Sequence, residues 1–186
     1  MNGTLVTKEY SSEGKNTNVG TFLAKRGVIL VKEFRDMASI NGDYGNKINV
    51  TTVILSSAKS THGDVQFGVK LEHVDDNDDT RGSRFLDYDE LDELIGAFDF
   101  IDGVANKMAN QLRDYTEVTY STKDDVRLGF YQMEERQQGF VNVGDYGASL
   151  FLSLPGLRQL QKSIKAAKSH LLSRGAEAFN GETPTT

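Results

Sequence analysis

The stretch FLDYDELDELIGAF, residues 85–98, is echoed by FLSLPGLRQLQKSI, residues 151–164. The offset of 151 − 85 = 66 residues aligns four identical apolar pairs: Phe85/Phe151, Leu86/Leu152, Leu91/Leu157 and Leu94/Leu160. Two interpretations are open. Any two capped amphipathic helices that follow strands look alike in this way, or a sheet-then-helix unit is duplicated in tandem.

Both stretches open segments with the periodicity of an amphipathic helix, because apolar residues recur at steps of three and four. Asp87 is the expected cap of the first helix, with Glu90 three residues later, and Ser153 caps the second with Pro155 in its first turn. The two apolar stripes are Leu91, Leu94, Phe98, Ile101, Ala105, Met108 and Leu112, and then Leu157, Leu160, Ile164, Ala167 and Leu171.

The rest of the chain reads as strands and turns, because it is rich in Val, Ile, Thr, Phe and Tyr between clusters of Gly, Asn and Asp. VTYSTKDDVRLGFYQ, residues 118–132, predicts a hairpin. Strands grouped before a helix, twice, predict an α+β fold of two antiparallel sheet-and-helix halves with the helices packed together at the centre. The expected strands are 4–10, 19–24, 28–36, 48–56, 65–74, 116–121, 126–134, 139–143 and 148–152.

A second echo lies upstream, where DVQFG (64–68) resembles DVRLG (125–129) and NVTT (49–52) resembles EVTY (117–120). We therefore divide the chain into an N-terminal half, residues 1–113, a C-terminal half, residues 114–174, and a flexible tail, residues 175–186. The two halves are expected to form one compact domain.

The two helical segments differ in charge. From Asp87 to Leu112 there are seven acids and one base, whereas from Leu157 to Arg174 there are five bases and no acid. Opposite charges beside matched apolar stripes favour contact between the helices, within a monomer or between subunits of a homo-oligomer. The alternative is that each charged face is simply solvated. The expected helix interface consists of Leu91, Leu94, Phe98, Ile101, Leu157, Leu160, Ile164 and Leu171.

The composition argues against several classes of protein. The 186 residues include no Cys and carry a net charge of −6, which argues against a duplex-DNA-binding protein with a basic surplus. The N-terminal residues lack the apolar core of a signal peptide, and no long apolar span is present. We expect a cytoplasmic protein without a membrane segment.

Motifs for catalysis are weak. His62, His73 and His170 are far apart in sequence, and no phosphate-binding loop or nucleophile elbow is present. The acidic turn at residues 75–79 resembles a calcium loop, but Thr80 and Leu86 stand where glycine and glutamate are required. We expect a non-enzymatic protein without cofactor or catalytic metal, and whether the acidic turn holds a cation stays open.

A sheet face is the remaining candidate for binding. Residues 24–36 interleave cations with an aromatic residue, and GDYG occurs at 42–45 and 144–147. Cations and aromatic platforms together are typical of single-stranded nucleic-acid binding. The alternative is that both GDYG sequences are ordinary turns. The candidate binding residues are Lys25, Arg26, Lys32, Phe34, Arg35, Tyr44, Lys47 and Tyr146.

A twice-repeated antiparallel sheet followed by a helix resembles the Whirly family and the related single-stranded-DNA-binding transcriptional coactivators. The family's lysine-glycine-lysine-alanine-alanine-leucine signature has its nearest counterpart at residues 25–30, KRGVIL, which keeps a basic residue, the glycine and the final leucine. The resemblance implies sheets that bind extended single strands and helices that assemble subunits. We therefore expect single-stranded nucleic-acid binding on a sheet face. The alternative is a protein-interaction or structural assembly module that binds no nucleic acid.

Overall fold

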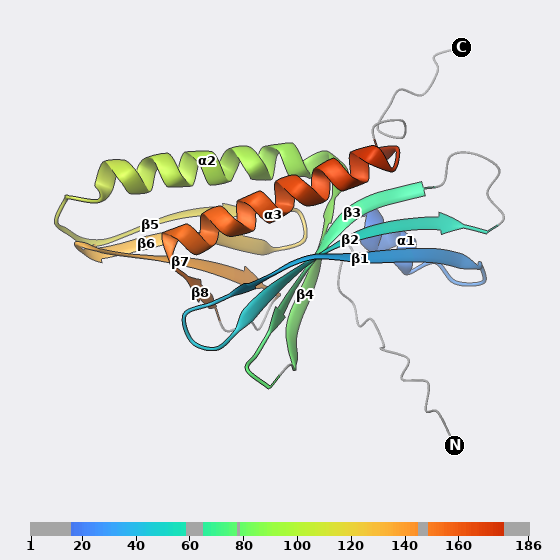
Figure 1. Cartoon of the computed structure of the whole chain (residues 1–186), viewed down its shortest axis with the longest axis horizontal. Helices are drawn as coiled ribbons and strands as arrows, with labels where there is room; N and C mark the ends of the chain where they lie inside the picture. The colour runs from blue at the N-terminus through green and yellow to red at the C-terminus, as the bar shows by residue number, and fades with distance from the viewer. Residues whose placement is uncertain (1–15, 59–64, 78, 145–148, 177–186) are drawn as a thin grey trace, which may run out of the picture.

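Two four-stranded antiparallel sheets form the framework of the computed structural model, which describes residues 16–58, 65–77, 79–144 and 149–176. The first sheet has the order β1-β2-β3-β4 and the second the order β5-β6-β7-β8, so the predicted α+β architecture of two halves is confirmed (Figure 1). The elements are α1 (Asn18–Leu23), β1 (Leu30–Asn41), β2 (Lys47–Ser57), β3 (Val65–Val74), β4 (Thr80–Asp87), the 3-10 helix η1 (Tyr88–Glu90), α2 (Leu91–Met108), β5 (Arg113–Ser121), β6 (Val126–Glu134), β7 (Arg136–Val143), β8 (Leu150–Leu152) and α3 (Leu154–Ser173).

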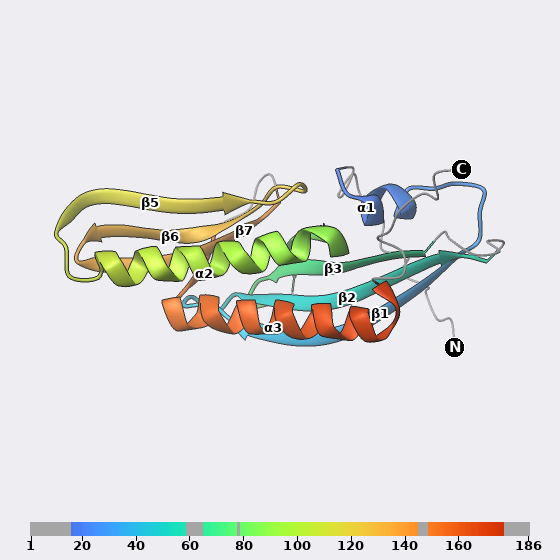
Figure 2. The same ribbon diagram turned by 90° about the horizontal axis from the view of Figure 1, so that it is seen from above.

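Each long helix packs on the sheet of the other half. Helix α2, which follows the first sheet in the chain, contacts β5 and β6 of the second sheet. Helix α3, which follows the second sheet, contacts β1, β2 and β3 of the first sheet and also β7 and β8. Figure 2 shows α2 beside the second sheet and α3 running along β1 and β2. The two halves are therefore interleaved through their helices.

One hydrophobic core runs through both halves and contains residues of both sheets and both long helices. Strand residues alternate between the two faces of a sheet, so every other strand residue points into this core. The helix-facing positions of the second sheet include Val126, Leu128 and Phe130 on β6, with Val141 and Val143 on β7. A smaller cluster lies on the other face of the first sheet, where α1 covers part of β2 and β4. This smaller cluster consists of Val19, Phe22, Val53, Leu55 and Phe85.

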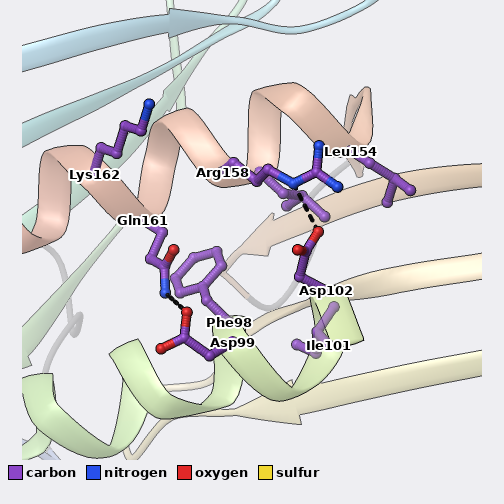
Figure 3. A pocket seen from close by; sticks show the side chains of 9 residues that line it. Phe98, Asp99, Ile101, Asp102, Leu154, Arg158, Gln161 and Lys162 are labelled. Carbon is purple, nitrogen blue, oxygen red and sulfur yellow. Dashed lines mark hydrogen bonds and ion pairs between the residues drawn. The ribbon is translucent and has the colours of Figure 1, made fainter. Parts of the chain in front are cut away.

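The two long helices lie side by side, as their opposite charges predict. Lys168 donates to Asp92 at 2.5 Å, and Arg158 donates to Asp102 at 2.8 Å. Between these ion pairs the Gln161 amide donates to the Asp99 carboxylate at 2.7 Å. The Arg158–Asp102 and Gln161–Asp99 pairs lie at the rim of an apolar crevice of about 160 Å³ between the helices (Figure 3). The predicted contact of the helices is confirmed within one chain, and all eight residues of the expected helix interface are at most 4% exposed.

The predicted strand at residues 19–24 is wrong, because the chain forms helix α1 there. Thr17 caps this helix by accepting a hydrogen bond from the Gly20 N–H at 3.1 Å. The Asp87 carboxylate, far along the chain, accepts hydrogen bonds from the N–H groups of Asn18 and Val19 at 2.8 and 3.0 Å. Tertiary capping thus overrides the strand propensity of Val, Thr and Phe in this short segment.

Strand β4, with the sequence TRGSRFLD, is not among the strands that the sequence predicts. Asp87 therefore ends a strand and makes no side-chain cap for the helix that follows it. Helix α2 ends at Met108, and Leu112 is 77% exposed instead of lying on the buried stripe. The Ser153 cap and the position of Pro155 in the first turn of α3 are confirmed.

The second sequence echo does not match equivalent strands. DVQFG leads into β3, the third strand of its sheet, whereas DVRLG leads into β6, the second strand of its sheet. NVTT lies on β2 and EVTY on β5, so these positions also differ by one strand. The 66-residue offset does match equivalent elements, because Leu86 and Leu152 both lie in the fourth strand of their sheet, Leu86 next to the last residue of β4 and Leu152 as the last residue of β8. The expected strand at 4–10 lies outside the described residues.

Candidate nucleic-acid interface

The outer face of the second sheet, which points away from the helices, is formed by every other residue of its strands. On β6 the outward positions include Arg127, Gly129 and Tyr131, because Val126, Leu128 and Phe130 point into the core. The register pairs Tyr131 with Gln138 of β7, and Phe140 of β7 with Phe151 of β8. This alternation therefore places aromatic side chains of three different strands on the same face.

Four aromatic rings form a continuous row on this face, which we call the aromatic row: Tyr115, Tyr131, Phe151 and Tyr44. Tyr115 stacks on Tyr131 with 5.9 Å between ring centroids and 24° between the planes. Tyr131 meets Phe151 edge to face at 6.4 Å, and Phe151 meets Tyr44 edge to face at 5.9 Å. The two end rings are open to solvent, with Tyr115 59% and Tyr44 72% exposed.

Tyr44 reaches the row from the other sheet, on the turn between β1 and β2. The Asp43 N–H donates to the Phe151 carbonyl at 2.9 Å, and the Gln138 amide donates to the Asp43 carboxylate at 2.8 Å. Gly42 makes this approach possible, because a Cβ at that position would lie 2.8 Å from the Phe151 carbonyl oxygen. The turn is therefore anchored to β8, and Tyr44 is held against Phe151.

The other end of the row is fixed by Glu117 on β5. Its carboxylate accepts hydrogen bonds from the Tyr115 hydroxyl at 2.6 Å and from the Thr119 hydroxyl at 2.7 Å. The bond to Tyr115 and then the bond to Thr119 lower the pKa of Glu117, and the same contact raises the pKa of Tyr115. The Tyr115 ring is therefore oriented by its own hydroxyl.

Charges of both signs surround the row. Arg127 and Arg136 point outward from β6 and β7 and are exposed. The acids Glu117 and Asp43 stand at opposite ends of the row. Among the described residues at outward positions of these strands, Arg127 and Arg136 are the cations near the row, whereas four aromatic rings form the row itself. The arrangement therefore favours base stacking over phosphate contacts.

The residues of the first half that the sequence predicts to bind nucleic acid do not form one surface. Lys32 and Phe34 lie on the outer face of β1, whereas Arg35 lies on the opposite face with its guanidinium 3.5 Å from Nδ1 of His170 on α3. Lys25 lies over the Phe22 ring of α1, 4.0 Å from its centroid. Arg26 follows α1 and is exposed, Lys47 begins β2, and Tyr146 lies outside the described residues.

The outer face of the first sheet also carries charges of both signs. Beyond Phe34 it has a shallow depression of about 460 Å³ that contains two acids, Asp36 and Glu72. Asp36 accepts a hydrogen bond from the Thr51 hydroxyl at 3.0 Å, and Glu72 pairs with Lys70 at 2.8 Å. Acids therefore accompany the cations on both faces, and the difference lies in the aromatic rings. Phe34 is the exposed ring among the described residues of this face, whereas four rings join in the aromatic row, so the row is the better candidate for base stacking.

In the acidic turn at residues 75–79, a carboxylate accepts hydrogen bonds from backbone N–H groups of the same turn. Asp75 is 5% exposed, and its carboxylate accepts hydrogen bonds from the N–H groups of Asn77 and Asp79, each at 3.0 Å. Within the described part of the chain, no group of three or more His, Asp or Glu side chains is placed to hold a metal ion. The local hydrogen bonds account for the turn.

Sequence reasoning found Tyr44 but missed Tyr115, Tyr131 and Phe151. Phe151 was assigned to the repeated apolar pattern, yet only its counterpart Phe85 is fully buried. An available signal was the alternation on β6, where Tyr131 has the parity opposite to Leu128 and Phe130. That signal places Tyr131 on the outer face, but it does not reveal which residues of other strands lie beside it.

No helix among the described residues is long and apolar enough to cross a membrane. No protein-family model matches the chain, and no curated protein matches it.

Proposed function

We propose that this protein binds single-stranded nucleic acid on the outer face of the second sheet, without catalysing a reaction on it. The observation that carries the proposal is the aromatic row, in which three ring contacts of 5.9, 6.4 and 5.9 Å join residues of both sheets. Every nucleobase has a face that stacks on an aromatic ring, so such a surface binds a single strand with little sequence preference.

The charges around the row predict weak dependence on salt. Each base stacked on an aromatic side chain contributes about 1–3 kcal/mol, whereas each phosphate neutralised on a single strand adds about −0.7 to the slope of log K against log salt. With Arg127 and Arg136 as the two outward cations, we expect a slope of about −1.4. A steeply electrostatic binder would show a much larger slope.

The test is a fluorescence titration of labelled oligothymidine with the full chain. Tyr44→Ala and Tyr131→Ala each remove one stacking platform, so each should weaken binding by about 5- to 150-fold. Phe100→Ala is the matched control, because Phe100 is an aromatic side chain that is 70% exposed on α2, away from the row. The control variant should bind like the unmodified protein.

The same titration separates the two sheets. Lys32→Glu and Arg35→Glu change the surface that the sequence indicated and should leave binding within about twofold. Loss of binding in these variants, with full binding in Tyr131→Ala, would move the site to the first sheet. Absence of binding at about 50 mM salt, where phosphate contacts are favoured, would end the proposal.

Two further observations support the proposal. The order of elements, four strands then α2 and four strands then α3, agrees with what the Whirly resemblance implies. Glu117 is already occupied by two hydroxyl donors at 2.6 and 2.7 Å, which favours a structural role over acid–base chemistry.

A protein-interaction module is the alternative, favoured by the acids Glu117 and Asp43 at the two ends of the row. Aromatic rings flanked by carboxylates also suit a basic segment of a partner protein, through cation–π contacts. Titration with oligolysine in place of oligothymidine tests this alternative. Binding of oligolysine that Tyr131→Ala weakens, without binding of oligothymidine, would select it.

Assembly through the helices also stays a prediction. Ile164 and the other expected interface residues are used within one chain, where they are at most 4% exposed. A helix-mediated oligomer would therefore have to use the outward faces of α2 and α3. Ile164→Asp is now expected to unfold the chain instead of dispersing an oligomer.

A further inference from the structure

The four edge strands of the two sheets differ in what lies beside them. The β4 edge is met by the second half of the chain, because the Phe85 N–H donates to the Asp124 carboxylate at 3.1 Å and Gly82 lies against the Val143 carbonyl. The β8 edge is met by the β1–β2 turn through the bond from Asp43 to Phe151 at 2.9 Å. Strand β1 is an edge strand of twelve residues, and residues 31–36 are exposed.

Exposed apolar side chains concentrate on and just before this edge. Ile29 is 66%, Val31 is 46% and Phe34 is 42% exposed. A long edge strand with exposed apolar side chains is a template for pairing with another strand. The structure therefore presents a surface for strand addition along β1.

The five residues Lys32-Glu33-Phe34-Arg35-Asp36 alternate between the two faces of the sheet. Glu33 and Arg35 point to α3, where they contact Arg174 at 2.8 Å and His170 at 3.5 Å. Phe34 points to the other face, because it pairs with Val53, which packs in the cluster under α1. Asp36 shares that face through its bond to Thr51 at 3.0 Å, and Lys32 has the same parity.

We propose that two copies of this chain associate by antiparallel pairing of their β1 strands about a two-fold axis at Phe34. Residues directly opposite each other in such a pair share a face, and their numbers sum to 68 for this axis. Lys32 then faces Asp36 of the second copy on the outer side, and Glu33 faces Arg35 of the second copy on the α3 side. The two Phe34 rings face each other, and the two-fold axis makes each of the two oppositely charged pairs occur twice.

Neighbouring registers lose this complementarity. An axis at Lys32, Glu33, Arg35 or Asp36 puts a charge opposite its own copy, and an axis at Val31 puts Lys32 opposite Leu30. The charged stretch also lies within the regular part of the strand, before the register shift between Asp36 and Ala38. On β5, by contrast, the axis that pairs Arg113 with Glu117 falls on Tyr115, within a register shift. The sequence of β1 thus specifies one self-pairing and one register.

This pairing goes beyond the proposed nucleic-acid binding and leaves its surface open. The first sheets of the two copies join into one continuous sheet along residues 32–36. The aromatic rows lie on the second sheets except for Tyr44, which is in the β1–β2 turn beyond this paired stretch. Oligothymidine binding and β1 pairing can therefore fail independently. A variant that separates the copies should still bind one strand per chain.

Cysteine cross-linking tests the axis directly, because the chain contains no Cys. Residues opposite each other in antiparallel strands have Cα atoms about 4.5–5.5 Å apart, within the span of a disulfide. Under mild oxidation of the full chain, Phe34→Cys should give a disulfide-linked dimer. Val31→Cys is the matched control of similar exposure, and it should remain uncrosslinked because its opposite residue is Met37.

Sedimentation equilibrium of charge variants tests the pairing without cross-links. Lys32→Glu places an acid opposite Asp36 twice and should weaken the dimer about tenfold or more. Adding Asp36→Lys to the same chain restores opposite charges and should restore the dimer. The proposal is overturned by a chain that is monomeric at every concentration, by a dimer that Lys32→Glu leaves unchanged, or by cross-linking at Val31→Cys instead of Phe34→Cys.

Discussion

The Asp124 carboxylate, in the turn between β5 and β6, accepts a hydrogen bond from the backbone N–H of Phe85 on β4 at 3.1 Å. Asp124 is 4% exposed, and the two residues belong to different halves of the chain. A side chain of the second half thus satisfies a backbone donor at the edge of the first sheet, as an added strand would.

We expect Asp124→Ala to lower the free energy of unfolding by about 1–3 kcal/mol, because the Phe85 N–H loses its acceptor in a buried place. Asp124→Asn keeps an acceptor oxygen and should have a smaller effect. Glu135→Ala is the control, since Glu135 is an exposed acid in the turn between β6 and β7. Urea unfolding followed by circular dichroism measures all three variants. Equal stability of Asp124→Ala and the unmodified chain would contradict the prediction.

Glu90 should make stability depend on pH. Burial raises the pKa of Glu90 from 4.5 to about 7, and the negative charge of Asp87 adds to this shift. The Lys123 ammonium, 4.0 Å from the Glu90 carboxylate, acts in the opposite direction. Neither carboxylate oxygen has a hydrogen-bonding side chain among the described residues. The pKa of Glu90 is higher in the folded chain than in the unfolded chain, so protonated Glu90 favours the folded state. This contribution to stability is complete below pH 4.5 and is lost as the pH rises through about 7.

Glu90→Gln should remove the loss of stability that ionisation of Glu90 causes as the pH rises. Relative to the unmodified chain, the variant should become more stable as pH rises from 4.5 to 7, by about 1–3 kcal/mol once solvent screening is allowed for. Thermal or urea unfolding across this range measures the difference. Glu135→Gln, at an exposed position, is the comparison. A difference for Glu90→Gln that does not grow with pH would contradict the prediction.

Two glycines should respond to alanine in opposite directions. A Cβ at Gly129 would lie within van der Waals overlap of the Val118 carbonyl on the neighbouring strand. Gly129→Ala should therefore cost about 1–3 kcal/mol or more. Gly103 lies in α2 with open space around its Cβ position, so Gly103→Ala should stabilise the chain by about 0.5–1 kcal/mol. Melting temperatures of both variants test the pair, and stabilisation by Gly129→Ala would refute it.

The exchange of helices predicts that neither half folds alone. Cutting the chain before Arg113 separates the first sheet from α3, which covers β1 and β2, and separates the second sheet from α2. Residues 1–112 and 113–186, expressed separately, should show no cooperative unfolding, and mixing them should restore it. Circular dichroism and NMR amide dispersion provide the measurement. A half that unfolds cooperatively by itself would exclude the interleaved arrangement.

The pattern of apolar residues and charges in the sequence predicted the two long helices, seven of the eight strands that the structure describes, and the contact between the acidic and basic helices. These features follow from local periodicity and capping, such as the bond from Gly156 to the Ser153 hydroxyl at 3.2 Å. Residues 19–24 and 80–87 were misassigned because Asp87 and Asp124 decide their structure from far along the chain.

Only the tertiary structure decided which helix covers which sheet and which aromatic side chains meet. Parity along one strand places Tyr131 outward, but the register and a turn anchored by Gly42 and Asp43 bring Tyr44 from the first sheet to Phe151 of the second. The physical reason is the distance along the chain over which each kind of interaction acts. Periodicity reports which face of an element is buried, whereas contacts between strands and halves depend on packing among residues that are distant in the sequence.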